Sequence, residues 1–158
     1  MPFDMMNGYH NRLVMRIYTI LKGQNEIISA DKVDWESIGF QNKDNIATDF
    51  RATGVLGILN LLYFLDKRSN SYAEIRRIFK LSTDSKQEFP FMIASFALSK
   101  CTLDALREPE TLSYVDDSNL AELAQDYFVA LLRRLEERWR QEGLTITDFH
   151  KTIDQIRI

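Results

Sequence analysis

The chain has 158 residues, of which 45% are hydrophobic and 27% charged, and its 20 Lys and Arg against 23 Asp and Glu leave a net charge of −3. This length predicts one globular domain over residues 1–158, with a core large enough to fold without disulfides. The charge balance lacks the basic footprint of a nucleic-acid-binding protein, and the single Cys101 favours a reducing, cytoplasmic compartment.

The first predicted helix spans residues 8–22, after a start that has no apolar core of a secretory signal. Its apolar residues recur at steps of three and four, and Gly23 follows as a C-terminal stop. We expect a peripheral amphipathic helix that packs its apolar face on the domain. Because its charged residues are all basic, the alternative is a helix that contacts a membrane surface or a partner.

A short helix and a loop are predicted next. Ser29 to Trp35 resembles a short capped helix that ends near Gly39, and residues 40–52 are expected to form an ordered, turn-rich loop.

Residues 53–66 are apolar almost all round, which predicts a central helix buried on every side. The run is too short to cross a bilayer, and Asn60 interrupts it, so no transmembrane segment is expected. Gly54 and Gly57 each weaken the helix by about 1 kcal/mol relative to Ala. We therefore expect their small size to allow close packing or close backbone approach.

The following helices are predicted from capping patterns. Ser71 to Glu74 and Ser85 to Glu88 match capping boxes, which mark helix starts. After the second box, Pro90 fits the first turn of a helix that runs to Leu106. This helix carries a stripe of mostly small residues, typical of close packing: Phe91, Ala94, Ser95, Leu98, Cys101, Thr102 and Ala105.

The longest helix is predicted to begin near Asp116 or Asp117 and to end before Gly143. Thr147 and Asp148 then cap a last short helix. No segment alternates with period two, so the predicted fold is all-α, a single compact domain of about six or seven helices around the central helix 53–66.

Few residue types suited to catalysis are present. His10 and His150 lie at opposite ends of the sequence, and with one cysteine there is no tetrahedral zinc set such as paired C-x-x-C, so metal catalysis is not expected. Cys101 sits on an apolar helical face, where a thiol acts as a small hydrophobe. Gly54 and Gly57 lack the lysine and the preceding strand of a phosphate-binding loop.

One segment, residues 35–64, resembles the signature of the ELMO (engulfment and cell motility) domain. The matching stretches are Trp35-Glu-Ser-Ile-Gly-Phe-Gln41, Thr48-Asp-Phe-Arg51 and Gly54-Val-Leu-Gly-Ile-Leu-Asn-Leu-Leu-Tyr-Phe64. Weaker similarities follow at Phe89-Pro90-Phe91, at Trp139 and at Ile146-Thr-Asp-Phe149. The family fold that the resemblance implies is all-α.

The resemblance implies a GTPase-activating protein for a small GTPase of the Arf or Arf-like family, because Arg51 matches the arginine of that branch. Arg51 would be supplied as an arginine finger from the 40–52 loop. Asp44 and Asp49 would hold the unliganded guanidinium, and Gln41 and Thr48 would brace the loop. No cofactor of the domain itself is implied, since the partner GTPase carries GTP and Mg²⁺.

Two alternatives stay open. A second branch of the family consists of non-catalytic adaptors that bind a small GTPase or a DOCK-type exchange factor in cytoskeletal and engulfment signalling, including phagocytosis. Arg51 itself can instead be a structural residue that pairs with Asp49 or Asp44. The chain also departs from the family pattern, because Ala52 replaces a glycine and Asn42 another, and the usual proline before Thr48 is absent.

Several aromatic residues of the signature are expected in the core rather than at a contact surface: Trp35, Phe40, Phe50, Tyr63 and Phe64.

Overall fold

The computed structural model describes residues 1–26, 28–66, 72–113, 116 and 118–156, and this part of the chain contains no strand. Its α-helices are α1 (Gly8–Leu21), α2 (Val55–Leu65), α3 (Tyr72–Ser82), α4 (Phe91–Leu106), α5 (Pro109–Leu112), α6 (Leu120–Gln141) and α7 (Phe149–Gln155). Four 3₁₀ helices accompany them, η1 (Ala30–Lys32), η2 (Glu36–Ile38), η3 (Ile46–Phe50) and η4 (Ile146–Asp148). The predicted all-α fold is confirmed.

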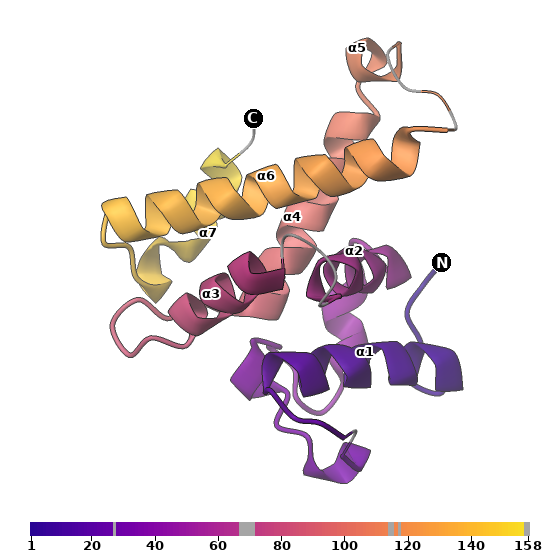
Figure 1. Cartoon of the computed structure of the whole chain (residues 1–158), viewed down its shortest axis with the longest axis vertical. Helices are drawn as coiled ribbons and strands as arrows, with labels where there is room; N and C mark the ends of the chain where they lie inside the picture. Colours follow the sequence, from indigo (N-terminus) through magenta and orange to yellow (C-terminus); the bar gives the residue numbers. More distant parts are fainter. Residues whose placement is uncertain (27, 67–71, 114–115, 117, 157–158) are drawn as a thin grey trace.

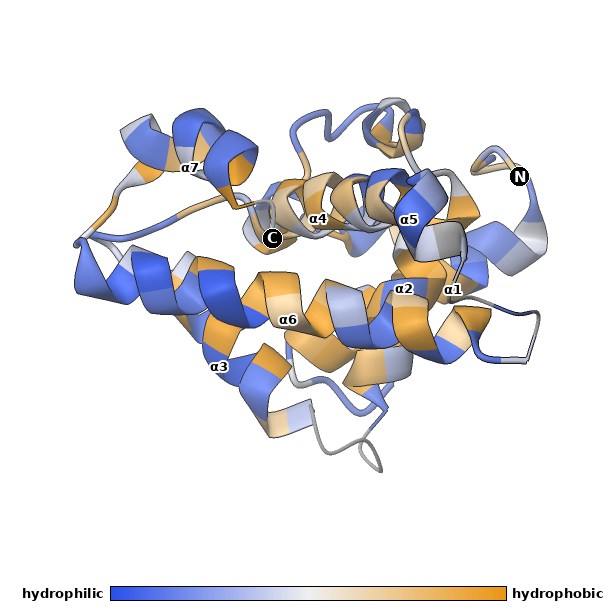
Figure 2. Ribbon diagram, turned by 90° about the horizontal axis from the view of Figure 1, so that it is seen from above, coloured by the Kyte–Doolittle hydropathy of each residue, from blue (hydrophilic) through white to orange (hydrophobic). Residues whose placement is uncertain are grey.

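The helices pack around α2 and α4 (Figure 1). Helix α2 lies between α1 and α4, and α4 in turn packs against the long helix α6. Figure 2 shows that α2 and α4 are largely hydrophobic, whereas much of α3 and the C-terminal half of α6 are hydrophilic. Helix α1 buries the apolar face formed by Val14, Ile17 and Leu21, so this face is not available to a membrane. None of the described helices is both long and apolar enough to cross a bilayer.

Helix α2 is central, but the expectation that it is buried on every side is wrong. Leu59 is 48% exposed and Tyr63 is 51% exposed, whereas Ile58, Leu61 and Leu65 are fully buried. Tyr63 is therefore not a core residue, although Phe64 is. Helices α1, α3 and α4 pack on α2 and leave one stripe uncovered, and an apolar sequence does not indicate which side remains uncovered.

Two predicted helix starts differ from the structure. Residues 29–39 form the two short 3₁₀ helices instead of one capped helix, and the Ser29 hydroxyl donates to the Asp31 carboxylate rather than capping a helix. At the second capping box it is Asp84 that accepts from the backbone N–H groups of Lys86 and Gln87, which closes a turn. Helix α4 begins after this turn, with Pro90 as its N-cap residue rather than in its first turn.

The other predicted ends lie close to the observed ones. Helix α4 stops at Leu106, as predicted, and Pro109 begins the short helix α5. Helix α6 begins at Leu120, where the backbone N–H bonds to the Asp116 carbonyl oxygen, and Gly143 follows its end with a φ of +61°. The predicted cap at Ser71 and the alternative start at Asp117 lie outside the described residues.

Three glycines allow close approach between segments. A Cβ on Gly39, whose φ is +93°, would lie 2.3 Å from the backbone nitrogen of Phe91 at the start of α4. A Cβ on Gly54 would lie 2.2 Å from the Met1 carbonyl oxygen, and one on Gly57 would lie 2.9 Å from the Phe96 ring. The expected need for small residues at positions 54 and 57 is confirmed.

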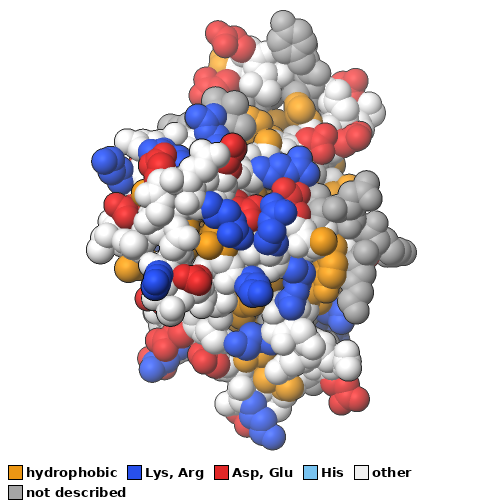
Figure 3. Space-filling model, turned by 60° about the vertical axis from the view of Figure 1, so that its left-hand side comes forward, with side chains coloured by type: hydrophobic (Ala, Val, Ile, Leu, Met, Phe, Trp, Pro, Cys, Tyr) orange, Lys and Arg blue, Asp and Glu red, His pale blue; other side chains and the backbone are white. Residues whose placement is uncertain are grey.

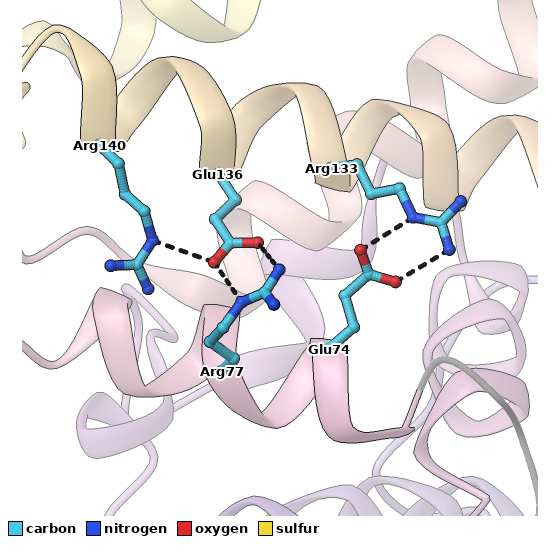
Figure 4. Close-up of polar contacts among 5 residues, drawn as sticks. All are labelled: Glu74, Arg77, Arg133, Glu136 and Arg140. Atoms are coloured by element: carbon cyan, nitrogen blue, oxygen red, sulfur yellow. Dashed lines mark hydrogen bonds and ion pairs between the residues drawn. The ribbon is translucent and has the colours of Figure 1, made fainter.

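Long polar side chains join α3 to α6 (Figure 4). The Glu136 carboxylate accepts hydrogen bonds from Arg77 at 2.6 and 2.7 Å and from Arg140 at 3.1 Å. One turn away, Arg133 donates two hydrogen bonds to Glu74. Burial raises the pKa of the Glu136 carboxyl, but the hydrogen bonds and charges of the two arginines outweigh it, so the pKa lies below its ordinary value of 4.5.

Replacing Gly39 with alanine is expected to lower the free energy of unfolding by roughly 2–5 kcal/mol, because it adds backbone strain and an overlap with α4. Urea denaturation measures the loss. Gly143→Ala is the matched control, since its φ of +61° is also positive but no heavy atom lies within 4 Å of a Cβ there. The control should lose only about 1–2 kcal/mol. Equal losses in the two variants would contradict the close contact.

Replacing Glu136 with glutamine is expected to lower the free energy of unfolding by about 1–3 kcal/mol at neutral pH. A carboxyl whose pKa is lowered by folding stabilises the fold above its ordinary pKa, and the contribution is lost as the pH falls through the folded value. The difference from the unmodified protein should therefore shrink below pH 4.5. Chemical denaturation at a series of pH values tests this.

Glu142→Gln serves as the control for Glu136→Gln, because Glu142 forms an exposed pair with Arg138 on one helix. Its loss should stay within about 0.5 kcal/mol. A Glu136→Gln variant whose deficit does not change with pH would show that the charge of Glu136 is not responsible.

Candidate functional site

Arg51 lies at the C-terminal end of η3, between that turn and the start of α2. Its side chain is exposed, and within the described part of the chain its guanidinium forms no ion pair or hydrogen bond. The alternative in which Arg51 pairs with Asp49 or Asp44, and the expectation that these carboxylates hold the guanidinium, are therefore not seen. The charged group of Arg51 faces solvent at the end of this turn.

The residue before Arg51 anchors this turn in the core. Phe50 is 1% exposed, and its ring stacks on Phe3 with the ring centroids 4.0 Å apart. The Phe50 ring also packs against Phe96 of α4 at 4.5 Å and against Phe40 at 5.6 Å. Its carbonyl oxygen accepts the Gly54 N–H at 2.7 Å. The backbone at position 51 is thus fixed from both sides.

Asp49 braces the loop from within. Its Oδ2 accepts the backbone N–H of Gln41 at 2.9 Å and that of Asn42 at 3.4 Å, so it ties the start of the 40–52 loop to η3. The Thr48 hydroxyl donates to the Asn45 carbonyl oxygen at 2.9 Å. Gln41 therefore takes part through its backbone, and the bracing side chains are Asp49 and Thr48. Asp44 is exposed and forms none of these bonds.

Arg51 lies between two open hollows. One, of about 600 Å³, is lined by all five residues that the sequence singled out, together with three neighbours: Glu36, Gln41, Asn42, Lys43, Asp44, Thr48, Asp49 and Arg51. The other, of about 420 Å³, lies against the N-terminal segment and the start of α2. A surface that enters either hollow would meet the Arg51 side chain.

The N-terminal segment is a part of the site that sequence reasoning missed. Met1 accepts the Val55 N–H through its carbonyl oxygen at 3.1 Å, and Met1, Pro2 and Phe3 line the second hollow. Phe3 is held from its other side by the buried His10 ring, at 5.6 Å. Nothing local in the sequence pairs residues 1–3 with position 55; the only signal is an isolated Phe3 before the first helix.

Ala52, where the family pattern has glycine, is accommodated without strain. The described part of the chain contains no residue other than glycine with a positive φ, so the backbone at position 52 suits an alanine. Position 54 is the one in this turn with a positive φ, and it is a glycine. No group of His, Cys, Asp and Glu side chains among the described residues is arranged to hold a metal ion.

The sequence is similar to a known protein family over most of its length. The sequence model described as the ELMO/CED-12 family matches residues 1–153. ELMO domain-containing protein 3 of Mus musculus is 33% identical over 147 residues, which cover 92% of this chain and 38% of that protein. The Homo sapiens protein of the same name is 30% identical over 158 residues, covering 98% and 40% respectively.

A protein of Dictyostelium discoideum is also similar to this chain. ELMO domain-containing protein B of Dictyostelium discoideum is 30% identical over 113 residues, which cover 72% of this chain and 38% of that protein. The chain spans about two fifths of the length of these curated relatives. No solved structure matches significantly.

Replacing Asp49 with alanine is expected to free the N–H groups of Gln41 and Asn42, and to lower the free energy of unfolding by about 1–2 kcal/mol. Hydrogen exchange at these two amides should become faster, while exchange in α4 should not change. Asp44→Ala is the control, and its stability should stay within about 0.5 kcal/mol of the unmodified protein. Unchanged exchange at positions 41 and 42 in Asp49→Ala would contradict the brace.

Proposed function

The chain belongs to the ELMO/CED-12 family, and from this membership and the exposed guanidinium of Arg51 we propose that it is a GTPase-activating protein for a small GTPase of the Arf or Arf-like family. The observation that carries the proposal is the position of Arg51. It combines an unpaired, solvent-facing charge with a backbone fixed by Phe50 and Gly54. An arginine with only a structural role would be expected to have a partner.

Arginine suits the chemistry of this role. GTP hydrolysis passes through a transition state in which negative charge spreads over the γ-phosphoryl oxygens, and an inserted guanidinium stabilises that charge. The planar fork of arginine stays charged and matches two phosphate oxygens at once. Such a finger accelerates hydrolysis about 10³- to 10⁵-fold, which corresponds to roughly 4–7 kcal/mol of barrier.

The remaining chemical groups belong to the partner. The GTPase supplies the nucleotide, Mg²⁺ and the residue that positions the attacking water. If the GTPase supplies these groups, the residues around Arg51 need no catalytic role of their own and can serve to hold the loop. The carboxylate of Asp49, for example, is occupied by two backbone N–H groups.

A non-catalytic adaptor is the second candidate. The observation in its favour is the exposed pair Leu59 and Tyr63 on α2, which offers apolar contact area that does not involve Arg51. An adaptor of this kind would bind a small GTPase or a DOCK-type exchange factor without accelerating GTP hydrolysis.

Single-turnover GTP hydrolysis by a panel of Arf and Arf-like GTPases tests the proposal. The unmodified protein should accelerate GTP hydrolysis by at least one GTPase of the panel. The stimulated rate with Arg51→Ala should be about 10³-fold lower than with the unmodified protein. Arg51→Lys should recover little, because an ammonium cannot reproduce the planar fork. Lys43→Ala, which removes an exposed cation lining the same hollow, is the matched control and should keep most of the activity.

Two outcomes would count against the finger. Equal stimulation by the unmodified protein and Arg51→Ala would exclude a catalytic role for this side chain. Binding of a GTPase by both proteins without any acceleration would favour the adaptor.

A further inference from the structure

A cationic face covers the side of the molecule where α3 lies beside α6. We define this α3–α6 cationic face by Arg77 and Lys80 of α3 and Arg133 and Arg140 of α6, all of them exposed. Figure 3 shows the Lys and Arg side chains gathered over the centre of this side of the molecule. The feature is unexpected in a chain whose net charge is −3.

The acidic partners of these arginines lie beneath them rather than beside them. The Glu136 side chain is 5% exposed, whereas those of Arg77 and Arg140, which bind it, are 59% and 48% exposed. Glu74 is likewise 18% exposed under Arg133 at 59%. The two carboxylates therefore hold the guanidinium groups in place (Figure 4) and are themselves less exposed than the arginines that bind them.

The hydrogen bonds to the carboxylates leave donors for a ligand. They engage Nε and Nη2 of Arg77 and Arg133, and only Nε of Arg140. Within the described part of the chain, Nη1 of Arg77 and Arg133 and both Nη atoms of Arg140 remain for other acceptors. Lys80 lies one turn after Arg77 and extends the face along α3.

We propose that the α3–α6 cationic face docks on a membrane surface rich in anionic phospholipids. Outward-facing guanidinium groups match phosphate oxygens, and several cations spread over two adjacent helices suit an extended array of headgroups. Helix α2, which packs on α3, also exposes Tyr63, and tyrosine is enriched at membrane–water interfaces. Four exposed cations spread over two adjacent helices suit an extended lipid surface better than a single acidic segment of a protein. The inference does not depend on the role of Arg51.

The test is co-sedimentation of the whole chain with vesicles. The unmodified protein should pellet with vesicles of phosphatidylcholine and phosphatidylserine and stay in solution with phosphatidylcholine alone. Each cation near an anionic bilayer contributes a factor of about five in binding, so Lys80→Glu, which changes the charge by two, should weaken binding at least about tenfold. Salt at about 1 M shortens the Debye length to about 3 Å and should release the protein.

Arg107→Glu makes the same charge change away from this face. Phe91 at the start of α4 packs on Phe79 of α3, and Arg107 follows the other end of α4, roughly 24 Å away at 1.5 Å per residue. This control should bind the anionic vesicles as the unmodified protein does. Urea denaturation of both variants checks that they are folded, and Lys80→Gln should weaken binding about fivefold without introducing a negative charge.

Three results would overturn the proposal. The first is no pelleting of the unmodified protein with phosphatidylserine vesicles, and the second is an equal loss in Lys80→Glu and Arg107→Glu, which would reflect net charge alone. The third is capture by polyglutamate-coated beads without binding to vesicles, which would assign the face to an acidic protein.

Discussion

The burial of Phe50 is the interaction on which the candidate site depends. Its ring is in contact with Phe3 from the N-terminal segment and with Phe96 from α4, so three segments that are far apart in the sequence meet at one side chain. Burying an aromatic ring of this size stabilises a fold by about 2–3 kcal/mol. The backbone of Arg51 cannot move away from its position without pulling this ring from the core. The core thus determines where an exposed charge lies, although the charge itself contacts nothing in it.

Glycines hold the two ends of the same loop. Gly39 lies against the start of α4, and Gly54 lies against the Met1 carbonyl oxygen, in both cases at distances that exclude a Cβ. Between these ends, Asp49 ties the loop to itself. Ordering the backbone of one residue costs about 1–2 kcal/mol, so a loop that is already ordered spares that loss when a partner binds. The exposed Arg51 side chain, with a rotamer entropy of up to about 2 kcal/mol, still has to be fixed on binding.

The fold could be predicted from local patterns to a large extent, whereas the assembly of the site could not. Helical spacing places α4 and α6 within a few residues, because their buried faces repeat at every turn. The uncovered stripe at Leu59 and Tyr63 has no local sequence signal, since it depends on which neighbours pack on α2. The turn closed by Asp84 resembles a helix cap in sequence because both use the same short polar residues. The family signature singles out Arg51, Asp49 and Thr48 together, but the contact of Phe3 with Phe50 joins residues 47 positions apart and leaves no local pattern.

Helix α4 connects the two surfaces on which the proposals rest. Its Phe96 packs on Phe50 behind the candidate finger, and its Phe91 packs on Phe79 of α3 behind the α3–α6 cationic face. A membrane contact through α3 and α6 would therefore set the orientation of Arg51 relative to the bilayer through one rigid helix. Binding energy from such a contact would come from a separate face and would not stabilise the ground state at the finger. Arg51 would then be free to make its strongest interaction only when charge develops in the transition state, which is the condition under which an interaction increases the rate.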